Sequence, residues 1–193
     1  MSHMKALFEV SGGFSVPSGS YLLFALLGVG AAGVAVAAMQ AVTWTERGLR
    51  ASRLPDWLRP AVGGALLSML ALFAPQVLGS GHGAVQFHFD TRWTFWALAA
   101  LLILKLAASA VSVGSGFRGG LFSSALFLGT LFGAVFAQGL AYFSPGLEAQ
   151  HDVFMLAGMG AVAAAVIGAP LTMVFLVLEA TGDFQVTVAV VIA

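Results

Sequence analysis

A glycine- and serine-rich segment in the second half of the chain carries the residues best suited to chemistry. It reads Gly-Ser-Gly-Phe-Arg-Gly-Gly-Leu-Phe-Ser-Ser over positions 114–124, and an apolar run follows it as far as Phe143. The spacing predicts that this run is a helix. Its predicted first turn comprises Gly119, Gly120, Leu121 and Phe122. The N–H groups of that turn have no partners inside the helix.

Such a helix start favours the binding of an anion. The helix dipole places partial positive charge there, and glycines before the turn allow an ion to approach the backbone closely. No formal charge is needed, which suits a halide in a low-dielectric setting. Arg118 would draw anions toward the site, and hydroxyl donors would come from Ser115, Ser123 and Ser124. The spacing alone leaves a second interpretation open, a flexible loop that only lets two helices cross.

Charged residues within the apolar runs are few, and each invites an explanation. We predict that Lys105, in the middle of a long apolar run, faces protein or a wet cavity. Glu179 and Asp183 bracket Thr181-Gly182, and they could relay protons. The structural interpretation is favoured, in which Gly182 ends a helix near the membrane interface. Asp152 is placed to cap the helix that is predicted to begin at Val153.

Three other patterns indicate chemistry only weakly. Gly28-Val29-Gly30-Ala31-Ala32-Gly33 has the spacing of a dinucleotide fingerprint but lies in an uncharged run, so close helix packing explains it better. His82 and His88, near Asp90, lack the further ligands of a metal site. Ser80 and Ser115 lack the motif of an intramembrane serine protease. Because the chain has no cysteine, thiolate metal sites and thiol nucleophiles are excluded. We expect no catalytic residues, metal or cofactor.

The amino-acid composition indicates whether water or lipid surrounds these elements. Apolar residues make up 60% of the 193 positions and charged residues 8%, with mean hydropathy +0.98. Soluble domains carry about 25% charged residues, so the chain is predicted to be an all-α integral membrane protein. Its net charge is zero, and nucleic acid is not an expected partner.

The apolar runs predict a multi-pass bundle with broken, re-entrant helices. The runs are 21–43, 60–78, 93–113, 119–143, 153–168, 171–178 and 184–193. The last three runs are too short to cross the roughly 30 Å core of a bilayer upright. Ala169-Pro170 separates the first two of these three runs. Broken helices at membrane depth are tolerated inside protein or beside a cavity, where transporters hold ions. The polar segment Glu46–Arg59, which holds four arginines, is predicted to be a cytoplasmic loop. Residues 1–16 are predicted to be a terminal remnant and linker.

The stretch from Gly158 to Thr181 resembles the CLC family of chloride channels and proton/chloride exchangers. It contains the pattern Gly-Met, then Ala-Pro-Leu-Thr, then Leu-Val-Leu-Glu-Ala-Thr. The Gly114–Ser124 segment resembles the family's filter signature Gly-x-Phe-x-Pro, with Ser124 in place of proline. Looser similarity reaches back to about Ser15. The family's other two filter signatures, Gly-Ser-Gly-x-Pro and Gly-[Lys/Arg]-x-Gly-Pro, are not found.

The resemblance implies that residues 17–193 are the second half of an inverted-repeat membrane domain, truncated at its C-terminus. It implies an anion site at the backbone amides of Leu121 and Phe122, and a basic residue in or near the pathway at Lys105. It further implies a homodimer, with the first span and the last two helical pieces at its interface. The missing first half would be required for a complete pore.

The expected function is therefore transmembrane chloride transport, as part of a voltage-gated channel or a proton/chloride antiporter in a cell membrane, predicted to be a bacterial inner membrane. An alternative of another class is a non-conducting structural fragment or interaction module of a membrane transporter. An intramembrane enzyme is a distant third.

Overall fold

The computed structural model describes residues 21–52, 55–73, 94–117, 121–143 and 151–193, and every regular element in these ranges is an α-helix. The helices are α1 (Tyr21–Ala51), α2 (Arg59–Phe73), α4 (Phe95–Gly114), α5 (Leu121–Phe143), α6 (His151–Ile167), α7 (Pro170–Thr181) and α8 (Phe184–Ile192). α1, α4 and α5 are long and apolar enough to cross a membrane. The 17 residues of α6 extend about 25 Å. The all-α fold with short, interrupted helices is confirmed.

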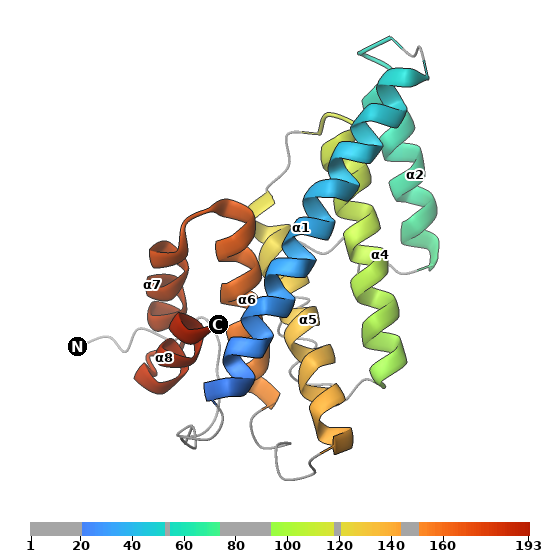
Figure 1. Cartoon of the computed structure of the whole chain (residues 1–193). Helices are drawn as coiled ribbons and strands as arrows, with labels where there is room; N and C mark the ends of the chain where they lie inside the picture. The colour runs from blue at the N-terminus through green and yellow to red at the C-terminus, as the bar shows by residue number, and fades with distance from the viewer. Residues whose placement is uncertain (1–20, 53–54, 74–93, 118–120, 144–150) are drawn as a thin grey trace, which may run out of the picture.

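Helices α5 and α6 form the centre of the molecule (Figure 1). Their backbones touch, because a Cβ atom added to Gly158 would lie 2.7 Å from the carbonyl oxygen of Gly129 and 2.9 Å from the backbone of Gly133. The main buried cluster joins α5 and α6 to α1, α7 and α8. A second buried cluster joins them to α4. Helix α5, which follows the predicted anion site, therefore belongs to the closely packed pair at the centre of the molecule.

Helix α1 crosses this pair diagonally, from the α8 side toward α2 (Figure 1). The Phe24 ring stacks on Phe154 of α6 with centroids 4.8 Å apart. Gly28 packs directly against Ala193, and a Cβ atom added to Gly30 would lie 2.6 Å from the Phe132 ring. The predicted packing role is confirmed for both glycines. Gly33 has no such neighbour within 4 Å.

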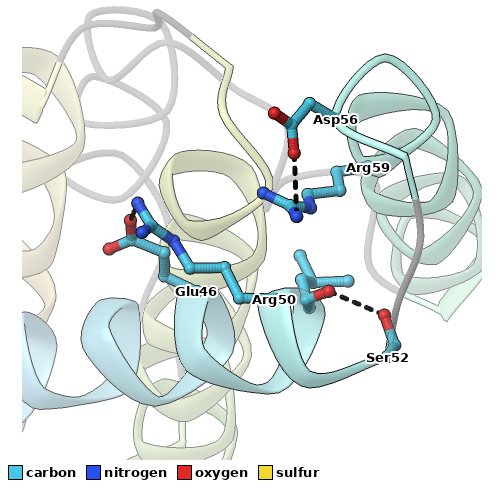
Figure 2. A network of polar contacts seen from close by, with 6 residues as sticks. Glu46, Arg50, Ser52, Asp56 and Arg59 are labelled. Carbon is cyan, nitrogen blue, oxygen red and sulfur yellow. Dashed lines mark hydrogen bonds and ion pairs between the residues drawn. The ribbon is translucent and has the colours of Figure 1, made fainter.

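The prediction of a loop beginning at Glu46 was wrong. α1 continues to Ala51, so Arg47 and Arg50 are helical. The Glu46 carboxylate pairs with the Arg50 guanidinium one turn later (Figure 2), an i,i+4 pair of the kind that extends helices. Asp56 pairs with Arg59 at 2.8 Å, at the start of α2.

The predicted breaks near the C-terminus are present. α6 ends before Gly168, whose φ is 75°, and Pro170 opens α7. α7 ends at Gly182 in a left-handed conformation, as predicted. The Asp183 carboxylate then accepts a hydrogen bond at 2.7 Å from the Gln185 N–H and caps α8, which supports the structural interpretation of this acid. Asp152 is not the N-cap that we predicted, because α6 begins at His151 and Asp152 lies in its first turn.

Candidate anion-binding site

Helix α4 ends immediately before the predicted site in a two-bond C-terminal cap. The Phe117 N–H donates to the Ser112 carbonyl at 3.2 Å, and the Gly116 N–H donates to the Val113 carbonyl at 3.0 Å. This pattern requires a left-handed residue after the helix, and Gly116 has φ 96°. A residue with a side chain would be strained there. The sequence therefore stops α4 sharply, so that the chain turns before α5.

Ser115 lies at this helix end with only 2% of its surface exposed. Its hydroxyl donates to the Ser112 carbonyl at 3.0 Å, and its side chain is pressed against Gly63 of α2. Its hydrogen is thus already engaged. An anion that used Ser115 as a donor would have to compete with this bond.

As the structure describes it, helix α5 starts at Leu121. Leu121 and Phe122 occupy its first turn, where N–H groups lack intrahelical acceptors. The Phe122 side chain is 40% exposed, and Ser123 and Ser124 are partly buried. Arg118, Gly119 and Gly120 lie outside the described residues. The structure thus places the two predicted amides at the start of a 23-residue helix whose interior is buried.

Lys105 is buried in the middle of α4, with 5% of its surface exposed. Its ammonium Nζ lies 5.0 Å from the centroid of the Phe127 ring on α5, within the range of a cation–π contact. The prediction that Lys105 faces protein is confirmed. Phe127 follows Leu121 by six residues, or about 9 Å along the axis of α5. In a low-dielectric interior a charge beside α5 adds to the positive potential at the start of that helix.

Ser109 was missed by the sequence reasoning. It lies one helical turn beyond Lys105 on α4, is 9% exposed, and its Oγ has no hydrogen-bond partner among the described residues. A single serine in an apolar helix carries no motif, so only the packing around it shows that it is buried.

Metal chemistry finds no support in the described ranges. There, no three His, Asp or Glu side chains gather closely enough to hold a metal ion. His82, His88 and Asp90 lie outside those ranges, as does Ser80. What the described residues bring together is a helix start rich in N–H donors and a buried ammonium near the same helix, an arrangement that attracts anions.

Comparison with known proteins fits this geometry. The sequence matches the family of voltage-gated chloride channels over residues 1–193. The chain belongs to this family. Members that resemble it include the H⁺/Cl⁻ exchange transporter ClcA of Cronobacter sakazakii, 34% identical over 196 residues that cover 97% of this chain and 41% of the relative. The voltage-gated ClC-type chloride channel ClcB of Escherichia coli is 30% identical over 195 residues, covering 100% and 46%.

A solved structure has the same fold as this member of the chloride-channel family. The crystal structure of a slow cyanobacterial Cl⁻/H⁺ antiporter matches with a TM-score of 0.79 and 24% identity, and the match covers 96% of this chain and 44% of the other. The chain thus spans less than half the length of these relatives.

Proposed function

We propose that this chain provides anion-binding elements of a chloride-transporting membrane protein, without a covalent step and without a bound cofactor. The observation that carries the proposal is the position of Leu121 and Phe122 in the first turn of α5. Gly120, the residue before them, has no side-chain oxygen that could cap the helix, so we propose that their N–H groups bind the ion.

Two further observations support an anion as the ligand. The buried ammonium of Lys105 lies against α5 itself, and an intramembrane lysine that faces protein typically marks an ion pathway. Arg118 is three residues before the helix start, where it would raise the local concentration of anions. The names of the ClcA and ClcB relatives, which specify chloride, agree with this chemistry.

Since the chain covers 41–46% of those relatives, we propose that it works beside a second half of similar size that completes the pore. The complete assembly would be a homodimer in a cell membrane, and in a bacterium this would be the inner membrane. The three apolar helices α1, α4 and α5 would hold the chain in the bilayer.

The test is a flux assay. The protein encoded by the complete reading frame that carries this chain is reconstituted into liposomes loaded with chloride, and a chloride electrode follows efflux after the membrane potential is clamped. We expect efflux well above that of empty vesicles. A pH electrode in the same chamber reports whether protons move in the opposite direction, as in an exchanger. Efflux equal to that of empty vesicles would contradict the proposal and leave a structural role.

A further inference from the structure

A groove lies along helix α1, from Ala32 to Arg47. It has a volume of about 590 Å³, within the range of small-ligand sites. One end is apolar, with Ala32, Val36 and Met39, and the other end is polar, with Thr43, Trp44 and Arg47. Ala32, Val36, Met39 and Thr43 recur at intervals of three or four, and so do Gln40, Trp44 and Arg47, so two neighbouring rows of the helix line the groove. Ala165, at the end of α6, forms the opposite wall.

The length of the groove along α1 matches the thickness of one leaflet of a bilayer. The uncharged run of α1 extends from Tyr21 to Thr43, and Ala32 is at its midpoint, which places Ala32 near the bilayer centre. Arg47 follows 15 residues later, about 22 Å along the helix. Half of a bilayer of about 40–45 Å, headgroups included, has the same thickness. The groove therefore runs from the midplane to the level of the headgroups.

The polar end has the character of a headgroup site. Trp44 is 67% exposed, as is usual for tryptophan at a membrane interface. The Thr43 hydroxyl donates to the Met39 carbonyl, so its oxygen is left as an acceptor. The arginines near this end differ in whether they form an ion pair. Arg50 and Arg59 are paired with Glu46 and Asp56 (Figure 2), whereas Arg47 makes no ion pair within the part of the chain that the structure describes.

We propose that this groove binds one anionic phospholipid, with an acyl chain along Ala32, Val36 and Met39 and the phosphate at the Arg47 guanidinium. Apolar walls exclude a free phosphate or another small ion from most of the groove. The single cation at its outer end selects a headgroup with net negative charge. By the positive-inside rule, this end belongs to the cytoplasmic leaflet, which carries the anionic lipids.

The experiment measures lipid retention by native mass spectrometry. The full chain in mild detergent is mixed with phosphatidylglycerol or phosphatidylcholine, and the fraction that carries one lipid is counted. We expect preferential retention of phosphatidylglycerol. Arg47→Gln should lower that retention about fivefold, the effect of one basic residue at an anionic surface. Arg50→Gln is the matched control, because it removes a neighbouring arginine that is already paired with Glu46, and it should retain lipid as the unchanged chain does.

Two further variants keep the result decisive. Arg47→Lys preserves the charge and should preserve the preference for phosphatidylglycerol. Ala165→Phe fills the groove from α6 and should reduce retention of both lipids. Equal retention by the Arg47→Gln and Arg50→Gln chains would overturn the proposal, as would equal retention of the two lipids. An unchanged chain that retains neither lipid, as expected if a protein segment covers the groove, would overturn it as well.

Discussion

The first turns of helices α5 and α8 both carry N–H donors, but only α8 has an acidic side chain that caps them among the described residues. At α8 the Asp183 carboxylate accepts a hydrogen bond from the Gln185 N–H at 2.7 Å, so one donor is used and a negative charge occupies the position that an anion would take. At α5 the helix begins at Leu121, directly after Gly119-Gly120, which bring no side-chain oxygen. A helix start binds an anion only when the chain itself does not fill it.

Helix α7 is intermediate between these two cases. Its N-cap Ala169 makes no side-chain hydrogen bond, and Pro170 in its first turn has no N–H to offer. Three different residue types thus stand at these three helix starts: an acid at α8, a proline at α7 and a pair of glycines before α5. Of these three residue types, glycine is the one that neither fills nor removes the donors of a first turn, and the buried ammonium of Lys105 lies beside α5.

The largest effect is expected when α5 is given the acid of α8. Gly120→Asp places a carboxylate directly before Leu121, where it would cap the first turn and repel anions. In the reconstituted protein, chloride efflux should fall by about a hundredfold or more, since both a charge-assisted hydrogen bond and the sign of the potential are lost. Gly120→Ala is the control and should retain most of the efflux. Undiminished efflux in Gly120→Asp would show that the ion does not use this helix start.

A smaller loss is expected when a single donor is removed, as in α7. Leu121→Pro deletes the first N–H of α5 while keeping a residue that suits the first helical position. The loss of one hydrogen bond to a charged group, about 1.5–3 kcal/mol, corresponds to a ten- to hundredfold drop in chloride affinity. Isothermal titration calorimetry measures this drop. Leu121→Ala, which keeps the N–H, separates the donor from the side chain, and equal affinities of the two variants would count against a backbone site.

Local sequence patterns predicted the helix breaks near the C-terminus, because each of those described breaks has a local cause. The helix end at Gly182 and the break at Gly168-Ala169-Pro170 follow from residues that cannot continue a helix. The end of α1 was misplaced because charge was taken as the mark of a loop. The side chains of Glu46 and Arg50 instead support the helix across one turn.

The candidate site was predictable only in its backbone part. Glycine spacing and the resemblance indicated the amides of Leu121 and Phe122 as an anion site, which stays a prediction, and both residues lie in the first described turn of α5. The position of Lys105 over the Phe127 ring depends on how α4 packs against α5, and the buried hydroxyl of Ser109 depends on how the neighbouring helices pack around α4. Neither is a property of a local pattern. Sequence reasoning therefore gave the helix start but could not show what surrounds it.

Removal of the buried ammonium should weaken chloride binding at the start of α5 without abolishing it. Lys105→Gln eliminates a charge that acts through the interior rather than by contact, so we expect chloride affinity to fall about fivefold, as for a coupling of about 1 kcal/mol. Phe127→Leu keeps the charge but removes the ring. It should cost about 1 kcal/mol of stability in a denaturant titration and change the affinity less than Lys105→Gln does. A larger affinity loss in Phe127→Leu would mean that packing, not charge, connects α4 to the site.

The smallest effect on transport is expected at α8, where the donor is already occupied. Asp183→Ala removes the cap and should lower the free energy of unfolding by about 1 kcal/mol, which a detergent–urea titration can detect, whereas Asp183→Asn should recover most of that loss. Chloride affinity should stay within error in both variants, because α8 would offer an uncapped helix start without the ammonium found beside α5. If Asp183→Ala instead creates a second chloride site, free N–H donors alone are sufficient for binding. Lys105 would then affect the strength of the α5 site but not its existence.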